Sequence, residues 1–247
     1  MKIFAALLLC VLALAACASQ NSQKQARSSP PTKTAARTDA FAVVRVDDAV
    51  DPLADVTNDR FPAGQGMSIF TERTMGSGGK IAEVHFVRTV AKQGEAPEDA
   101  CRRFTGWVQN AHISLPNGDA WACQTVLELD PETKRADPVG VRSFVLTGAP
   151  VITERDITDA YVGDDKSDEQ DFLDVAVKLS PSGRAKLKAG TADWIHRRLA
   201  IVADGMVSIA PLVKGEIDTD TLTIAFGERT PAELDRAQAY VSRLLGK

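Results

Sequence analysis

The chain reads RLAIVADGMVSIAP over residues 198–211, two apolar runs separated by one Asp-Gly pair. Leu199 to Val202 and Met206 to Ile209 are rich in β-branched and aliphatic residues, which is typical of strands. Asp-Gly is a strong short-range signal for a β-hairpin, because the favoured two-residue turn needs positive φ at both positions. The stretch therefore predicts an antiparallel hairpin with Asp204 and Gly205 at its turn.

Helical patterns lie on both sides of this hairpin. Ser180-Pro181 provides an N-cap and a proline at the first helical position, and Gly190 marks the expected end of that helix. Thr230 to Glu233 forms a capping box before a terminal helix with an apolar face, which ends at Gly246. The other elements expected in residues 139–247 are a short helix over Asp156–Tyr161 and strands over Phe172–Leu179 and Leu222–Phe226.

A first region, residues 41–138, has a similar mixture of patterns. The stretch Pro97–Ala111 predicts a helix whose apolar face, including Cys101 and Phe104, is best explained as core. Strands are expected over Phe41–Val46, Met67–Arg73, Ile81–Val90 and Ala122–Leu129. The fold class is therefore α+β: a mixed, mainly antiparallel sheet with helices on one face over residues 139–247, preceded by a smaller α+β region.

Two stretches partly resemble ligand-binding loops, one for phosphate and one for calcium, but neither has the residue spacing that such a loop requires. Gly76 to Gly79 precedes Lys80 as in a phosphate loop, yet Ile81 stands where Ser or Thr is required. The acidic stretch Asp164 to Asp171 has no Gly or terminal Glu where a calcium loop requires them. We expect a hairpin turn at the first, a solvated loop at the second, and no cofactor.

Motifs of catalysis are missing from the sequence. His85, His112 and His196 are scattered, and neither Gly-x-Ser-x-Gly nor His-Glu-x-x-His occurs. His85 lies in an apolar strand and His196 beside two arginines, so structural or surface roles explain both. We expect no enzymatic activity and no catalytic residues.

Four cysteines are present, and two of them fall near the N-terminus. Cys101 and Cys123 remain as one pair, and an oxidising compartment would favour a disulfide between them. The alternative is a metal site that includes His112. Two cysteines and one histidine at wide spacing fall short of a four-ligand zinc set, so no metal is expected.

The N-terminus has the order of a secretion signal. An apolar run follows Lys2 and ends at Leu14-Ala15-Ala16-Cys17, well short of the ~20 residues that span a bilayer. It resembles a bacterial lipoprotein signal, with an ordinary signal peptide as the alternative. The resemblance implies that residues 1–16 are removed and that Cys17 is diacylated, anchoring the protein to a membrane. By resemblance to the lipoproteins of bacteria with two membranes, Ala18 rather than Asp after the cysteine implies transport to the outer membrane, with the protein facing the periplasm.

Residues 17–40 read as a tether. Between Ala18 and Asp39 there is no Leu, Ile, Val or aromatic residue, so this stretch is expected to be disordered. Residues 1–40 contain five Lys or Arg against one Asp, and the rest of the chain carries a net charge of −8 out of a total of −4. An acidic body argues against nucleic acid as a partner. No second apolar run approaches membrane length.

The second region resembles the head part of the large periplasmic domain of SecD and SecDF, membrane subunits that assist protein export. The likeness is carried by Leu146-Thr147-Gly148, Asp156 to Ala160, Ser180 to Gly183, Thr191, Arg198 to Pro211, Ile217, Ile224 to Gly227 and the Thr230 to Leu245 helix. The resemblance implies a non-catalytic domain that contacts exported or envelope polypeptides. Unlike those subunits, this chain has no transmembrane segment after its signal, and residues 41–138 match the family poorly.

The hairpin is the strongest part of the match, so Asp204, Gly205 and Met206 are the candidate polypeptide-binding residues. The competing interpretation is that Asp204-Gly205 is simply the chemistry that the turn requires. A second hypothesis for the whole chain is a structural or assembly lipoprotein of the outer envelope with no link to export. Fold similarity alone does not decide between them.

Overall fold

The computed structural model describes residues 40–75, 80–132, 136–163 and 172–246, all within the compact unit Thr32–Lys247. Cys17 and most of the tether, the Gly76–Gly79 turn and the acidic loop over 164–171 lie outside the described residues. Among the described residues, no helix is long and apolar enough to cross a membrane.

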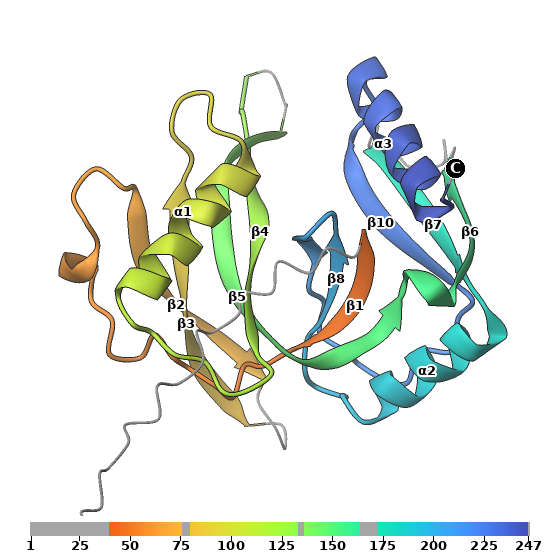
Figure 1. The fold of residues 1–247 in the computed structure, drawn as a ribbon, viewed down its shortest axis with the longest axis horizontal. Helices are drawn as coiled ribbons and strands as arrows, with labels where there is room; N and C mark the ends of the chain where they lie inside the picture. The colour runs from red at the N-terminus through yellow and green to blue at the C-terminus, as the bar shows by residue number, and fades with distance from the viewer. Residues whose placement is uncertain (1–39, 76–79, 133–135, 164–171, 247) are drawn as a thin grey trace, which may run out of the picture. The chain divides into compact units, whose positions relative to one another are not determined.

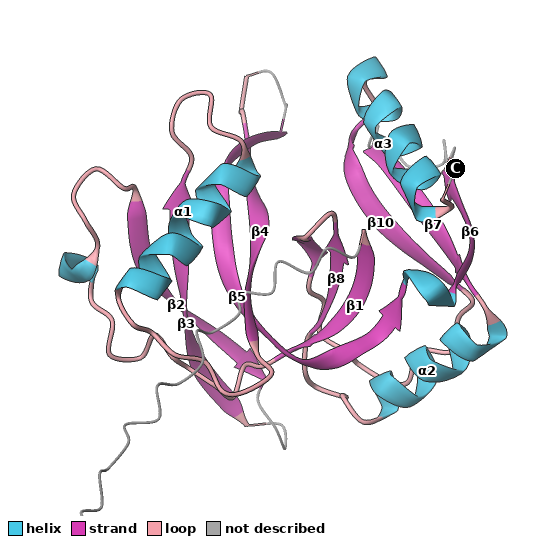
Figure 2. Cartoon of the chain, in the orientation of Figure 1, coloured by secondary structure: helices cyan, strands magenta, loops and turns pink. Residues whose placement is uncertain are grey.

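The described residues form two sheets and three α-helices (Figures 1 and 2). The larger sheet has the order β1-β8-β9-β4-β5-β3-β2, and the smaller β10-β7-β6. The strands are β1 (Phe41–Val46), β2 (Met67–Met75), β3 (Ile81–Val90), β4 (Ala120–Leu129), β5 (Ala136–Thr153), β6 (Ile157–Val162), β7 (Phe172–Leu179), β8 (Leu199–Ala203), β9 (Met206–Ile209) and β10 (Thr221–Glu228); the helices are α1 (Pro97–Asn110), α2 (Pro181–Ala192) and α3 (Pro231–Leu244). The α+β expectation is confirmed.

Five strands of the larger sheet close into a ring. β1 pairs with β8, β8 with β9, β9 with β4, β4 with β5, and β5 returns to pair with β1. The ring encloses one buried cluster, the ring core: Ala42, Val44, Val46, Ala122, Phe144, Leu146, Ala200, Val202 and Val207. Because side chains alternate along a strand, the odd-numbered residues of β1 and β8 face the other side.

Two further cores lie outside the ring. The head core takes buried side chains from β1, β5 to β8, β10, α2 and α3, and includes Phe41 and Leu199. The α1 core takes them from α1, the strands β2 to β5, and the segment between β1 and β2. In Figure 1, α1 covers the strands on one side of the ring and α3 covers the smaller sheet. The α1 core therefore belongs mainly to the first region and the head core to the second.

The strand β5 joins the two regions and had no counterpart among the sequence expectations. It contacts β4 and β3 in its first part and β1 in its last part. A Cβ at Gly140 would lie 2.2 Å from the carbonyl oxygen of Thr89, so glycine permits the close approach of β3 to β5. The expected boundary after Pro138 falls inside β5, and β1 of the first region lies within the ring. The two regions therefore share one sheet.

Two sequence expectations were wrong in the second region. The short helix over Asp156–Tyr161 is instead a 3-10 turn over Glu154–Asp156 followed by the strand β6. Pairing with β7 at Ala160 opposite Val177 overrides the local helical pattern. The other expected strands and helices are found with ends that differ by at most two residues.

The second error concerns Gly190, which does not end its helix. α2 continues to Ala192, and a Cβ at position 190 would lie 2.5 Å from Cγ1 of Val151. The glycine thus allows α2 to pack closely on β5. At the other end of α2, Ser180 accepts a hydrogen bond from the Gly183 N–H at 3.0 Å, as an N-cap does.

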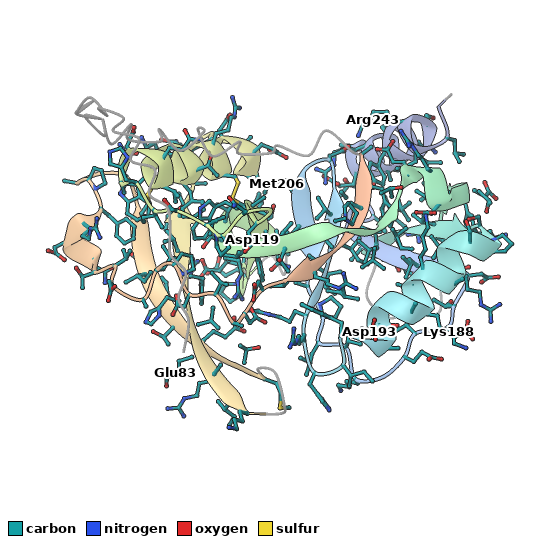
Figure 3. All side chains as sticks on the ribbon, turned by 60° about the horizontal axis from the view of Figure 1, so that its bottom comes forward. Glu83, Asp119, Lys188, Asp193, Met206 and Arg243 are labelled. Atoms are coloured by element: carbon teal, nitrogen blue, oxygen red, sulfur yellow. A yellow bond between two sulfur atoms is a disulfide. The ribbon has the colours of Figure 1, made fainter. Side chains whose placement is uncertain are left out.

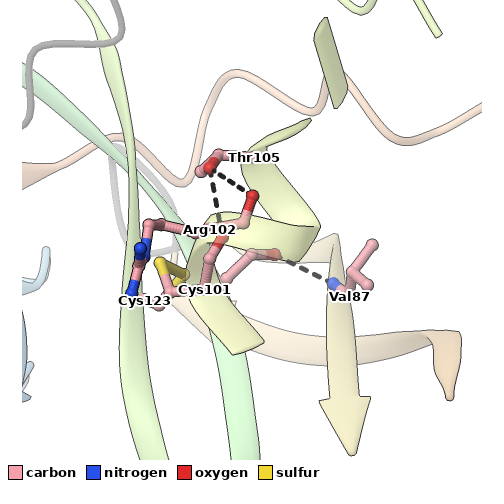
Figure 4. The surroundings of a disulfide bond; sticks show 6 residues. Val87, Cys101, Arg102, Thr105 and Cys123 are labelled. Atoms are coloured by element: carbon pink, nitrogen blue, oxygen red, sulfur yellow. Dashed lines mark hydrogen bonds between the residues drawn. A yellow bond between two sulfur atoms is a disulfide. The ribbon is translucent and has the colours of Figure 1, made fainter. Parts of the chain in front are cut away.

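A disulfide joins Cys101 of α1 to Cys123 of β4, with their Cα atoms 5.9 Å apart (Figure 4). The bond closes a loop with a sequence separation of 22 residues. Cys123 is fully buried in the α1 core, so the bond fixes the helix on the sheet.

Reduction of this disulfide is expected to lower the free energy of unfolding by about 3 kcal/mol, the loop-closure entropy for such a separation. Urea unfolding of the folded domain with and without a reductant measures the loss. A Cys101→Ala/Cys123→Ala variant should be as unstable as the reduced protein and insensitive to reductant. A reductant effect in that variant would show that the loss has another cause.

Arg103 of α1 is held by a partly buried carboxylate, that of Glu95. Its Nε and Nη2 donate to Glu95 at 3.0 and 2.6 Å, and Nη2 also donates to the Val90 carbonyl at 2.9 Å. The hydrogen bond from Arg103 and that from the Lys92 N–H hold the pKa of Glu95 at about 2, against an ordinary value of 4.5. The ionised form of Glu95 is therefore the one that stabilises the fold.

We expect part of the protein's acid sensitivity to come from Glu95. Because its pKa is lower in the folded state, its contribution is complete above pH 4.5 and is lost as the pH falls from 4.5 towards 2. The Glu95→Gln variant should show a shallower decline of the urea midpoint over this range. Glu83→Gln, at an exposed ion pair with Arg73, is the matched control and should keep the wild-type slope.

Candidate functional site

The β8–β9 hairpin has the conformation that its sequence predicts. Asp204 and Gly205 have φ values of +48° and +79°, as a two-residue turn of this kind requires. Asp204 is also bound by the surrounding fold: its N–H donates to the Ala40 carbonyl at 3.0 Å and its carboxylate pairs with Arg243 of α3. Burial raises the pKa of Asp204 despite that arginine.

Met206 follows the turn as the first residue of β9. Its side chain, labelled in Figure 3, is partly buried against the α1 core, whereas the Asp204 carboxylate pairs with Arg243 of α3. Ile209, at the end of β9, is 43% exposed and is the large apolar side chain that the hairpin presents to solvent. The tip therefore connects α3 with the α1 core, and its exposed apolar surface lies at Ile209.

A second group of functional-type side chains is a partly buried charge cluster, the Arg198 cluster, formed by Asp48, Glu72, Arg142 and Arg198, in which Arg198 and Asp48 are the most buried. Arg198 pairs with Asp48 through two nitrogen atoms, with Nε at 2.8 Å from Oδ2, and its Nη1 lies 3.1 Å from Oε2 of Glu72. The same Glu72 carboxylate binds Arg142. Glu72 and Arg142 lie on β2 and β5, whereas Asp48 follows the end of β1 and Arg198 immediately precedes β8.

Aromatic rings surround these guanidinium groups. Arg142 lies 4.2 Å from the centre of the Phe86 ring and 4.7 Å from that of Phe144, and Arg198 lies 5.2 Å from the centre of Phe144. Such contacts favour charged groups held next to an apolar core. A shallow recess at this end of the ring is lined by the cluster and by His85, whose Nδ1 lies 2.7 Å from Oδ2 of Asp51.

The two carboxylates and two guanidinium groups of the Arg198 cluster balance in charge, although Nε of Arg142 is buried without a hydrogen-bond partner. Burial would raise the pKa of Glu72, but Arg142 and Arg198 outweigh it and hold the pKa below its ordinary value. A carboxylate kept ionised between two arginines is not suited to accept or donate a proton near neutral pH. The cluster therefore acts as a structural clamp, meaning that its ion pairs hold together segments that are far apart in the sequence.

The remaining candidates from the sequence do not converge. His112 and His196 lie in separate backbone turns with φ of +54° and +65°. In the parts of the chain that the structure describes, no group of three or more His, Cys, Asp or Glu residues could hold a metal ion. Cys101 and Cys123 bond to each other rather than converge on His112.

The structure defines the class only as an α+β fold built on a strand ring, with a capped helix before and another after the β8–β9 hairpin in the sequence. Residues 129–236 match the family model described as SecDF, P1 head subdomain. These residues are therefore SecD-head-like, as the sequence resemblance indicated. The match begins at the end of β4 and ends within α3.

The chain is also similar to individual SecDF proteins. The protein translocase subunit SecDF of Brucella abortus biovar 1 (strain 9-941) is 37% identical over 87 residues, which are 35% of this chain and 11% of that protein. A solved structure of the membrane component SecDF that enhances protein export is 19% identical, with a TM-score of 0.34, and the match covers 83% of this chain and 92% of that one. SecDF in its super-membrane-facing form is 18% identical, with a TM-score of 0.34, over 89% of this chain and 30% of that one.

Proposed function

We propose that this protein is a lipid-anchored periplasmic protein whose SecD-head-like domain binds exported or envelope polypeptides without catalysing a reaction. The anchor is Cys17, and the outer membrane is the proposed location. The observation that carries the proposal is the match of residues 129–236 to the SecDF P1 head subdomain. The match spans about a tenth of the SecDF relative. The proposal is therefore limited to polypeptide binding by the head-like domain and does not extend to the other functions of that protein.

The β8–β9 hairpin is the first place to test for a bound polypeptide. Asp204, Gly205 and Met206 lie at its tip, and Ile209 adds an exposed apolar side chain on β9. The turn chemistry and the Asp204–Arg243 pair already explain the first two residues structurally. Met206 and Ile209 are therefore the positions that discriminate between binding and a purely structural turn.

In-cell photo-crosslinking tests this proposal. A photo-reactive residue at Met206 or Ile209 should capture polypeptides in the envelope, whereas one at Lys188 on α2, in an exposed ion pair, should capture far fewer. Capture that is equal at all three positions, or absent at all of them, would contradict specific binding by the hairpin. Crosslinking with mass spectrometry on Cys17→Ala then asks whether the anchor selects the partners.

A structural or assembly role in the outer envelope is the second candidate. The observation that favours it is that residues 40–128, with the disulfide, lie outside the family match. Deleting the first region would not test it, because β1 and β4 are part of the ring. Substituting an exposed residue there, such as Leu127→Ser on β4, avoids this problem. Loss of one envelope partner with export intact would favour the assembly role.

A further inference from the structure

The β2–β3 hairpin extends beyond the rest of its sheet. β3 pairs with β5 only through Arg88–Val90, whereas β2 and β3 remain paired out to Met75 opposite Ile81. Figure 3 shows this outer part, marked by Glu83, projecting from the domain. We call residues 70–75 and 81–86 the β2–β3 arm. A two-stranded ribbon is only marginally stable by itself, so the arm would be stabilised by a further strand.

The register of the arm shows which backbone groups face outward. The Val90 N–H donates to the Gly66 carbonyl at 2.8 Å, and hydrogen-bonded pairs alternate along an antiparallel ladder. The backbone N–H and C=O groups of even-numbered β2 residues therefore bond to β3, and those of odd-numbered residues point away from β3. Ile69 fits this pattern, because its N–H donates to the Asn58 side chain at 2.9 Å.

Thr71 is the next outward-facing residue along β2, and Arg73 follows it. Within the described ranges, neither N–H has a hydrogen-bond acceptor. Asn58 thus closes the edge at Ile69 and leaves it open from Thr71 onward. Proteins usually block such an edge with charge, proline or a covering segment, because it can pair with another chain.

Apolar side chains accompany this open edge. Phe70 is 44% exposed and stacks on Phe86 of β3 with ring centres 5.7 Å apart. Ile81, at the outer end of the arm, is 75% exposed. A strand added beside β2 would place one of its side chains next to Phe70, since side chains alternate between the two faces.

We propose that the outer edge of β2, at Thr71 and Arg73, binds an extended polypeptide as an added strand, with an apolar side chain of that polypeptide packed on Phe70. This proposal rests on the proposed function, which supplies the kind of ligand, an exported or envelope polypeptide. It places an additional binding site outside the family match at residues 129–236. Backbone hydrogen bonds supply affinity with little dependence on sequence, which suits a domain that must accept many polypeptides.

A second copy of the chain fits this edge poorly. Two β2 strands related by a two-fold axis would meet at Thr71, Glu72 or Arg73. Pairing centred on Thr71 would need the Ile69 N–H, which already donates to Asn58. Pairing centred on Glu72 would place two glutamates directly opposite each other, and pairing centred on Arg73 would do the same with two arginines, so like charges would repel. An unrelated polypeptide is free of these constraints.

The decisive variant is Thr71→Pro, which removes one outward N–H and leaves the β2–β3 ladder intact, since proline is tolerated on edge strands. Thr71→Val keeps that N–H and is the matched control. The probe is fluorescently labelled α-lactalbumin, permanently unfolded by reduction and carboxymethylation, titrated with the full chain. We expect Thr71→Pro to weaken binding at least tenfold and Thr71→Val less than twofold, with Phe70→Ala between them.

Amide hydrogen exchange on the wild-type chain gives an independent readout. Exchange at Thr71 and Arg73 should slow at least tenfold when the unfolded probe is bound. Equal binding by the two Thr71 variants, or unchanged exchange at these amides, overturns the edge site while the proposed function stands. Protection that appears without the probe and rises with protein concentration overturns it in favour of a second copy. No binding of the probe by wild type counts against the proposed function as well.

Discussion

Replacing Arg198 with methionine is expected to lower the free energy of unfolding by about 3–5 kcal/mol, the usual effect of removing one partner from a buried ion pair. The Asp48 side chain is only 8% exposed and would lose its main counter-charge. Glu72 would keep Arg142 but lose its second arginine. Urea unfolding at neutral pH, followed by circular dichroism, measures the change.

A double variant separates the ion pair from the packing of the arginine stem. Asp48→Leu/Arg198→Met removes both charges, and it should recover most of the stability lost in Arg198→Met, because apolar replacements of a buried pair are often neutral. Arg73→Ala breaks an exposed pair with Glu83 and should cost less than about 1 kcal/mol. If Arg198→Met were no more harmful than Arg73→Ala, the Arg198 cluster would not be a clamp.

Tyr240 of α3 is expected to give the second large effect. Its side chain is fully buried in the head core, its ring centre lies 5.4 Å from that of Phe226, and its hydroxyl donates to the Ala40 carbonyl at 2.9 Å. Tyr240→Ala should therefore cost about 3–5 kcal/mol, from lost burial and the remaining cavity. The same urea experiment measures it.

Two control variants divide this effect into its parts. Tyr240→Phe removes only the hydroxyl bond to Ala40 and should cost about 1 kcal/mol. Tyr161→Ala truncates a tyrosine on β6 that is 44% exposed, and should cost no more than that. A loss in Tyr240→Phe as large as in Tyr240→Ala would instead place the effect in the start of β1, which that hydrogen bond holds. Burial also raises the pKa of Tyr240, so the phenol stays neutral in all these experiments.

Much of the second region could be predicted because its signals are local. The Asp204-Gly205 turn, the Ser180 cap and the Thr230 cap each act within a few residues, and the structure contains all three. The hairpin stretch also carried the resemblance that the family match over residues 129–236 supports. The proposed role of the hairpin in binding polypeptides stays a prediction.

The errors occurred where contacts distant in sequence override a local pattern. Asp156 to Tyr161 was expected to be helical, but pairing with β7 makes most of it a strand. Gly190 was expected to end a helix, but its contact with Val151 gives it a packing role. The Arg198 cluster could not be found from spacing, because its residues stand at positions 48, 72, 142 and 198.

By itself the sequence determined the turns, the helix starts, most strands and the single cysteine pair of the folded body. Only the tertiary structure decided that β1 closes a ring with β5 and β8, that the two regions share a sheet, and that β2 leaves an open edge. The physical reason is the range of the interactions involved. Capping and turn preferences are fixed by neighbouring residues, whereas strand pairing and charge burial depend on which distant segments the whole chain brings together.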